Sequence, residues 1–254
     1  MSKITDVFPV PKPVYSGALS FIAGLECEIE EITNPAGVIG LFHAVNDGSL
    51  RNSGLEYVST PMVKNELVEN FKILHKTLKF KPGGDPFSVR TSTHVHINCQ
   101  SLSVENARTL VLLYALFEEF FFYMVKPARR DNIHCVPLTE TAMPRLYKGD
   151  LMKYYKNWHK YTALNLKRLS DLGTMEFRHL HGTNDAQEVS DWLTILENLW
   201  TLCQRVSINE QTLNREIIAD WFFIIFGHVP RILALRPTLF DIIRNSLIDV
   251  KLSV

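Results

Sequence analysis

The sequence predicts an α+β domain, in which a mostly antiparallel, curved sheet carries helices on one face and ends in a helical C-terminal part. Short runs that alternate apolar and polar residues, as half-buried strands do, occur at several places before residue 183. Long apolar or amphipathic stretches separate these runs and dominate the chain after Asp185. The length of 254 residues, with 46% hydrophobic content, is enough to bury one large core.

The chain divides into a short leader and one domain. Residues 1–20 contain three prolines and predict an extended leader. Residues 21–254 are expected to form a single domain, with a sheet core over about 21–183 and a helical part over 184–254. Helices packed on one face of an antiparallel sheet are the simplest way to bury this pattern.

Four segments predict strands. FIAGLECEIEEIT at 21–33 alternates apolar residues with glutamates, and a tight turn at Asp47-Gly48 leads into GLEYVST at 54–60. STHVHINCQ at 92–100 and GTMEFRHLHGT at 173–183 are further strand-like runs. Because the connections between them are helical or irregular, these strands are expected to form one sheet.

The remaining pattern is helical. An amphipathic helix is expected over 63–80, ended by PGGDP at 82–86. A long apolar helix should start at Ser103, a good N-cap with Asn106 in the following turn, and the charges within 104–125 argue against a membrane span. Helices follow from Asp185, and a final helix is expected over about 231–249.

Composition limits the partners. Lys+Arg and Asp+Glu both number 27, which argues against binding to nucleic acid, where clustered cations would be needed. Four widely spaced cysteines without a CxxC pair are typical of reduced thiols in a cytoplasmic protein. The N-terminus lacks the pattern of a signal peptide. We therefore expect a cytoplasmic protein without nucleic-acid or membrane partners.

Three of the predicted strands carry polar pairs at positions i and i+2, whose side chains point to the same face. The pairs are Glu26 and Glu28, His94 and His96, and Glu176 and Arg178. Partly exposed histidines on a sheet surface would explain the second pair alone, but buried charges are costly unless they are paired or bind a metal. Three such pairs therefore predict a polar concave face that binds Mg²⁺ or Mn²⁺, with an arginine able to hold a phosphoryl group. Neither a Walker A motif nor a GxGxxG after a strand is present.

The segments GLECE, THVHIN and TMEFRHLHGT, in this order, resemble the glutamine synthetase-like amidoligases over about residues 22–183. DGSL at 47–50, LEYVSTP at 55–61 and YTALN at 161–165 are similar to further segments of that family. The resemblance implies a catalytic fold like that of glutamine synthetase and γ-glutamylcysteine ligase. It also implies an ATP- and Mg²⁺- (or Mn²⁺-) dependent carboxylate–amine ligase that forms an amide or isopeptide bond through an acyl phosphate.

The resemblance assigns five metal ligands. Glu26 and Glu28 would face two cation sites, Glu56 would share the site of Glu28, and His94 and Glu176 would share the site of Glu26. A second ligand glutamate of glutamine synthetases, between the first strand and the HxH strand, has no counterpart in this sequence. Asp47 or a water molecule is the candidate for that position.

The resemblance also assigns the groups that handle substrate. His96 would contact the substrate carboxylate or phosphate, and Arg178 would stabilise the phosphoryl group in transfer. Arg129 and Arg130 lie where the family places arginines for the ATP phosphates. Glu30, two residues beyond Glu28, is expected to be a solvated charge at the end of its strand.

Two other functions remain open from the residues alone. The same His/Glu cluster would suit a metal-dependent hydrolase, and a degenerate, non-catalytic member of the family would keep the fold without activity. A ligase would use small-molecule or peptide acids and amines and would release ADP only when ATP is supplied. The sequence identifies neither substrate nor oligomeric state.

Overall fold

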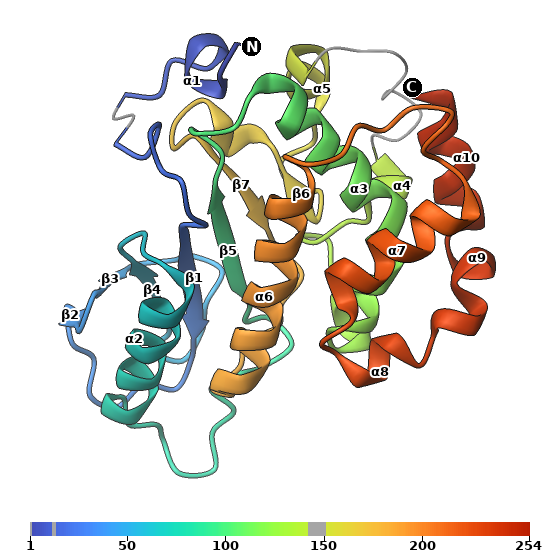
Figure 1. The fold of residues 1–254 in the computed structure, drawn as a ribbon. Helices are drawn as coiled ribbons and strands as arrows, with labels where there is room; N and C mark the ends of the chain where they lie inside the picture. The colour runs from blue at the N-terminus through green and yellow to red at the C-terminus, as the bar shows by residue number, and fades with distance from the viewer. Residues whose placement is uncertain (1, 12–13, 142–150) are drawn as a thin grey trace.

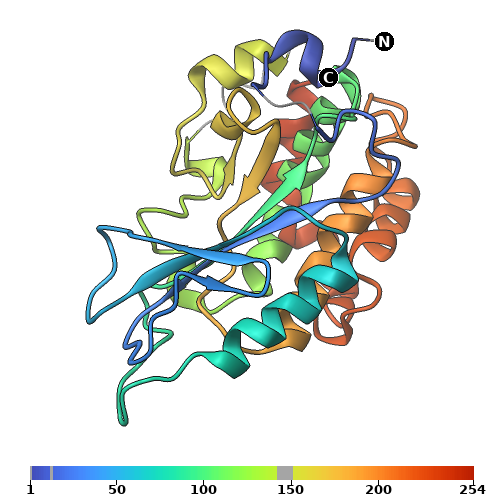
Figure 2. The same cartoon turned by 90° about the vertical axis from the view of Figure 1, so that its left-hand side faces the viewer.

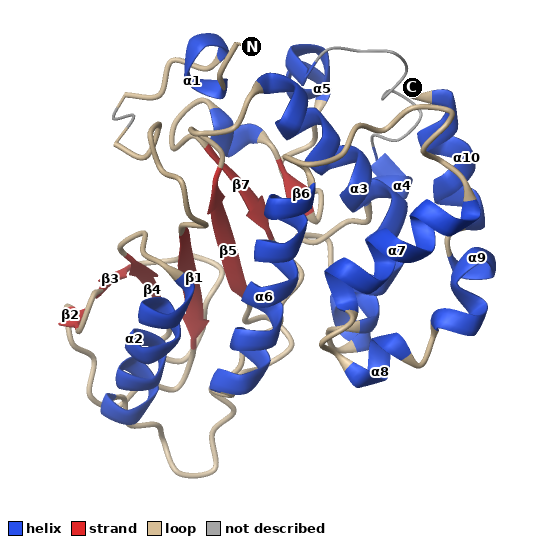
Figure 3. Ribbon diagram, in the orientation of Figure 1, coloured by secondary structure: helices blue, strands red, loops and turns tan. Residues whose placement is uncertain are grey.

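A seven-stranded sheet organises the computed structural model, which describes residues 2–11, 14–141 and 151–254 (Figure 1). The strand order is β2-β3-β4-β1-β5-β7-β6, and all six strand pairings between neighbours are antiparallel. The predicted fold class, an antiparallel sheet with a helical C-terminal part, is confirmed (Figure 3).

The strands include the four that the sequence predicts and three shorter ones. Their bounds are β1 (Ala23–Ile29), β2 (Val38–Ile39), β3 (Phe42–Val45), β4 (Leu55–Ser59), β5 (Thr93–Asn98), β6 (Leu164–Asn165) and β7 (Thr174–Phe177). The three that were not predicted, β2, β3 and β6, have only two to four residues each. An alternating pattern cannot be recognised over so short a length.

The longer helices begin and end close to their predicted bounds. The α-helices are α1 (Ile4–Val7), α2 (Lys64–Thr77), α3 (Val104–Tyr123), α4 (Leu138–Thr141), α5 (Leu151–Asn157), α6 (Ala186–Leu202), α7 (Arg215–Phe226), α8 (Pro230–Leu233), α9 (Leu239–Ile242) and α10 (Arg244–Leu252). The N-cap prediction is confirmed, since Ser103 Oγ accepts a hydrogen bond of 3.0 Å from Asn106 N. Asp185 caps α6 in the same way.

Two segments differ from the expectation. The predicted leader contains α1, whose Ile4 and the following Phe8 are buried in the core. The single final helix is wrong, because the chain forms α8, a 3₁₀ turn η4 (Arg236–Thr238), α9 and α10 instead. Pro237 lies in η4; it has no N–H to donate and disfavours helical geometry in the residue before it.

The helices cover one face of the sheet, as Figure 2 shows for α2 and α6. The apolar residues of β1, β5 and β7 point to that side and are almost completely buried: Leu25, Cys27, Val95, Ile97, Met175 and Phe177. Phe177 contacts Tyr114 and Phe121 of α3, which links β7 to the longest helix. The polar residues of the same strands therefore share the opposite face.

Cys27, Cys99, Cys135 and Cys203 are free thiols, and all four are buried. In the described part of the chain, we find no helix whose length and hydrophobicity would let it cross a bilayer.

Candidate active site

The strand register brings the three polar pairs together. Glu28 lies directly opposite Glu56 of β4, and Glu26 lies directly opposite His94 of β5. His96 lies opposite Glu176 of β7. Directly opposed residues of antiparallel strands have their Cβ atoms about 5 Å apart. The predicted convergence of the pairs on one face of the sheet is therefore what the structure shows.

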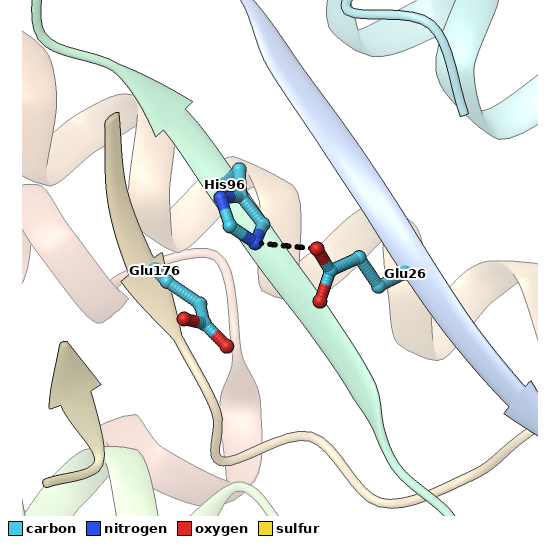
Figure 4. A group of neighbouring side chains, drawn as sticks. All are labelled: Glu26, His96 and Glu176. Atoms are coloured by element: carbon cyan, nitrogen blue, oxygen red, sulfur yellow. Dashed lines mark ion pairs between the residues drawn. The ribbon is translucent and has the colours of Figure 1, made fainter. Parts of the chain in front are cut away.

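Glu26, His96 and Glu176 form the first cluster, and each offers a ligand atom within 4.8 Å of the others (Figure 4). They extend toward one another from β1, β5 and β7. His96 Nε2 is 3.1 Å from Glu26 Oε1. His94 Nδ1 is also close, at 3.3 Å from Glu26 Oε2 and 3.4 Å from Glu176 Oε1. Both histidines thus touch the glutamates, and their separate roles remain predictions.

The members of the first cluster shift one another's pKa values. Burial alone would raise the pKa of Glu26, but close contacts with the imidazoles of His94 and His96, and the positive charge of these groups, outweigh burial and lower it. Burial is likewise outweighed at Glu176, whose pKa is lowered by His94, His96 and Arg178. The pKa of His96 is raised, since its contacts with Glu26 and Glu176 exceed the effect of burial. The two carboxylates are therefore ionised at neutral pH.

Glu28, Asp47 and Glu56 form the second cluster, again with ligand atoms within 4.8 Å of one another. Ser92 supports Glu28, whose Oε2 accepts hydrogen bonds from Ser92 N at 2.8 Å and Ser92 Oγ at 2.6 Å. Burial and the charges of Glu26, Glu28 and Asp47 raise the pKa of Glu56 to about 8. Asp47, the candidate for the missing ligand position, thus lies beside Glu28 and Glu56.

The donor atoms of both clusters fit a divalent cation. Carboxylate oxygens with at most one imidazole are the ligands that Mg²⁺ and Mn²⁺ accept. Among the described residues, the buried His96 Nε2 has no aligned hydrogen-bond partner. His94 Nε2 shares a 2.8 Å hydrogen bond with Ser92 Oγ, which already donates to Glu28. A neutral His94 would then donate through Nε2 and turn the lone pair of Nδ1 toward Glu26 and Glu176, as a metal ligand would.

Arg178 adjoins the first cluster. Its guanidinium forms an ion pair with Glu176, and its Nε donates to the backbone oxygen of His134 at 2.8 Å. Sequence reasoning missed two further neighbours of Glu176: Asn165 Nδ2 donates to Oε2 at 2.7 Å, and Arg168 Nε lies 3.7 Å from Oε2. Asn165 ends the YTALN segment, which the family resemblance singled out without assigning Asn165 a role. No local signal marks Arg168.

Arg129 and Arg130 make their contacts within the fold. Arg129 is buried, and its Nε donates to the backbone oxygen of His179 at 3.1 Å. Arg130 forms a two-pronged ion pair with Glu119 of α3, at 2.7 and 2.9 Å. Neither guanidinium belongs to a carboxylate cluster described above, and their contact with ATP phosphates stays a prediction.

The expectation for Glu30 is wrong. This carboxylate is buried rather than solvated, and it accepts hydrogen bonds of 2.8 Å from Arg51 N and from Ser88 Oγ. Arg90 Nε adds an ion pair at 3.5 Å. Glu30 therefore holds together the turn that follows Asp47 and the segment that precedes β5.

A cavity of about 400 Å³ adjoins the first cluster, because Glu26 and His96 are among its lining residues. Most other lining residues are apolar or uncharged, and they come from the N-terminal segment, β1, the end of β4, β5 and the loop before β7. Among the described residues, no lysine or arginine lines it. The cavity therefore suits an uncharged organic group placed next to the carboxylates.

Comparison with solved structures finds a similarity to the crystal structure of a bifunctional glutathione synthetase from Pasteurella multocida. The TM-score is 0.47 at 12% sequence identity, and the alignment covers 92% of this chain and 47% of that protein. The chain thus spans about half the length of that synthetase. No curated protein matches this sequence.

A family model provides the assignment. The model described as "Putative amidoligase enzyme" matches residues 43–200, which is more than half of the chain. The matched region contains β4, β5 and β7, with Glu56, both histidines of the HxH strand and Glu176. The protein therefore belongs to this amidoligase family.

Proposed function

We propose that the protein is an ATP- and Mg²⁺- (or Mn²⁺-) dependent carboxylate–amine ligase, which joins an acid and an amine through an acyl phosphate. The observation that carries this proposal is the pair of acidic clusters on one face of the sheet. Two neighbouring cations, held in this way, suit the transfer of a phosphoryl group, whose charge must be neutralised on both the attacking and the leaving side.

The reaction balances in two steps. A carboxylate oxygen of the acid attacks the γ-phosphorus of ATP, the bond to the β-phosphate oxygen breaks, and ADP leaves. The amine nitrogen then attacks the acyl carbon, inorganic phosphate leaves, and the nitrogen loses a proton. When bound, the divalent cations would neutralise the charge of the triphosphate.

The side chains of the chain have separable tasks in this scheme. Glu26 and Glu176, ionised at neutral pH, would hold one cation together with His94, and Glu28, Asp47 and Glu56 would hold the other. His96 would contact the substrate carboxylate or phosphate. Arg178 would stabilise the transferred phosphoryl group, because its guanidinium is fixed beside Glu176. Arg129 and Arg130 keep their proposed link to the ATP phosphates on the family resemblance alone.

The cavity beside the first cluster would hold the adenosine part of ATP. Its mostly uncharged lining suits a base and a ribose, and the absence of lysine and arginine among the described lining residues disfavours a phosphate inside it. Glu26 and His96 line the same cavity, so the triphosphate would leave it toward the first cluster.

The order of the motifs on β1, β5 and β7 supports a fold like that of glutamine synthetase and γ-glutamylcysteine ligase, and we propose this relationship. We also propose that residues 21–254 form one catalytic domain, since a continuous apolar core extends from Ile4 to Val250. The acid and amine would be small molecules or peptides. A cytoplasmic setting, without nucleic-acid or membrane partners, agrees with the four free buried thiols and the balanced charge.

Release of ADP tests the proposal. The purified protein, supplied with ATP and Mg²⁺, would be screened against acids and amines, with mass spectrometry of the products. Glu176→Ala should abolish ATP turnover while circular dichroism shows an intact fold, whereas Glu210→Gln, at an exposed position, should keep it. Equal turnover in the wild type and Glu176→Ala would contradict the catalytic role, and hydrolysis without ATP would favour a metal-dependent hydrolase.

A further inference from the structure

The N-terminal segment reaches the cavity at Tyr15, where the backbone is held by side chains of the central sheet. Tyr15 N donates to Gln100 Oε1 at 3.0 Å, and Asn98 Nδ2 donates to Tyr15 O at 3.2 Å. Asn98 and Gln100 follow His94 and His96 at the same spacing of two residues. The row of side chains that begins beside the first cluster thus ends with Asn98 and Gln100, which hold the N-terminal segment at Tyr15.

Gln100 joins two walls of the cavity. While its oxygen accepts from Tyr15, its Nε2 donates to the backbone oxygen of Leu172 at 2.9 Å. Gly173, with φ of +67°, follows Leu172, and a Cβ at this position would lie 2.4 Å from Gln100 Cγ. Only glycine therefore allows the loop to approach so closely. Gln100 is buried, and its two amide contacts fix Tyr15 and Leu172 relative to β5.

The side chain of Tyr15 extends across the end of β1. Its hydroxyl donates to the backbone oxygen of Pro61 at 3.4 Å, just beyond β4, while its backbone is attached to β5. Because β1 lies between β4 and β5, the Tyr15 side chain crosses over β1. Tyr15 lines the cavity together with Gly24 and Glu26 of β1. Tyr15 is only partly buried, so part of its surface remains free for a ligand.

We propose that Tyr15 contacts the nucleobase of ATP and that Gln100 positions it to do so. The inference rests on the proposed function, and it deepens it by making the N-terminal segment part of the nucleotide site. A tyrosine ring offers a flat, apolar surface on which a base stacks, and apart from the imidazole of His96 the other lining side chains are aliphatic or polar. The other end of the nucleotide would face the first cluster.

Calorimetric titration with Mg·ADP tests the contact. Tyr15→Ala should weaken binding by about tenfold, the size expected for the loss of one base–aromatic contact, and Tyr15→Phe should restore it. Tyr123→Ala removes an exposed tyrosine at the end of α3 and should leave the affinity unchanged. Binding of Mn²⁺ without nucleotide, followed by electron paramagnetic resonance, should be the same in all four proteins.

A double-mutant cycle tests the positioning role of Gln100. Gln100→Ala should weaken Mg·ADP binding as Tyr15→Ala does, and the combined variant should lose no more than either one, because both changes remove the same contact. Losses that simply add would contradict the positioning role.

The outcomes separate the two proposals. Unchanged Mg·ADP affinity in Tyr15→Ala, in a wild type that binds nucleotide, overturns the contact and leaves the proposed ligase intact. A wild type that binds Mn²⁺ but not Mg·ADP overturns the proposed function, and this inference with it. Photolabelling of the wild type with 8-azido-ATP should modify Tyr15 or its neighbours, and labelling confined to other segments would also contradict the contact.

Discussion

Glu56 of β4 lies directly opposite Glu28 of β1, so two carboxylates face each other across neighbouring strands, with Asp47 beside them. Like charges in directly opposed positions destabilise a sheet. The raised pKa of Glu56, about 8, is the measurable consequence, since burial and the nearby charges favour its protonated form. A bound cation would offset the repulsion between these two carboxylates. The protonation of Glu56 therefore tests whether the second cluster binds a cation.

The metal-free protein should lose stability as the pH rises. The pKa of Glu56 is raised from 4.5 to about 8 in the folded state, so between these values the folded protein holds a proton that the unfolded chain has released. The free energy of unfolding contributed by this group therefore falls across that window and is constant above it. Urea unfolding in EDTA at pH 5.5, 7 and 8.5 measures the fall, and Glu56→Gln should remove the share that Glu56 contributes.

Addition of Mn²⁺ or Mg²⁺ should raise the melting temperature of the wild type, and more strongly at pH 8 than at pH 6, because Glu56 must lose its proton to bind. Glu56→Gln should reduce this shift. Glu66→Gln, at an exposed position on α2, is the matched control and should behave as the wild type. A wild type whose melting temperature ignores both cations would contradict the cation sites.

Arg178→Lys should lower the turnover of ATP by about a hundredfold, with little change in Mg·ADP affinity. Arginine binds Glu176 and the His134 backbone oxygen through different nitrogens of its planar group, and lysine cannot keep both contacts. The loss of one oriented charge at a transition state typically has this size. Steady-state kinetics measure the effect, and Arg205→Lys, at an exposed position, should have none. Equal losses in the two variants would point to a general effect of lysine rather than to the site.

Gly24→Val should weaken Mg·ADP binding by at least about tenfold. Gly24 of β1 lines the cavity, so the methyl groups of a valine would occupy part of its volume. Gly24→Ala is the matched control. A Cβ at this position would lie 3.5 Å from Ser59 Oγ and 3.9 Å from Ser59 O, which is ordinary van der Waals contact. We expect Gly24→Ala to fold normally and to bind nearly as the wild type. Full affinity in Gly24→Val, measured by calorimetry, would place the nucleotide elsewhere.

Glu118→Gln should flatten a second pH dependence of stability. Glu118 is fully buried in α3, and burial raises its pKa from 4.5 to about 7, although Tyr114 and the backbone of Leu138 and Thr139 donate hydrogen bonds to it. Glu118 in the folded state thus holds a proton between pH 4.5 and 7, and its contribution to the free energy of unfolding should fall by up to ~3 kcal/mol across this range. The difference in urea unfolding between wild type and variant measures this term.

The control for this prediction is Glu216→Gln, on the exposed side of α7, which should follow the wild type at every pH. Parallel curves for the wild type and Glu118→Gln would show that Glu118 does not hold the extra proton. The apolar run that surrounds Glu118 predicts a core helix correctly, but it gives no sign that α4 is attached through this carboxylate.

Much of the site was predictable because strand geometry is local. A period of two places Glu26 with Glu28, His94 with His96, and Glu176 with Arg178 on one face, whatever the rest of the chain does. The caps at Ser103 and Asp185 are local in the same sense, because each satisfies backbone groups within its own first turn. The prediction of a single final helix was wrong because the apolar periodicity continues through Pro237, whereas the α-helical backbone is interrupted there.

The sequence by itself determined which residues share a face of each longer strand, and where the longer strands and the helices α2, α3 and α6 lie. Only the tertiary structure decided which strands are neighbours and in what register, and hence that Glu28 meets Glu56 and His96 meets Glu176. The same holds for Asp47 in the second cluster, the burial of Glu30, and Tyr15 at the cavity. Such contacts join residues far apart in the chain, and they depend on how the whole core packs rather than on any local repeat of side chains.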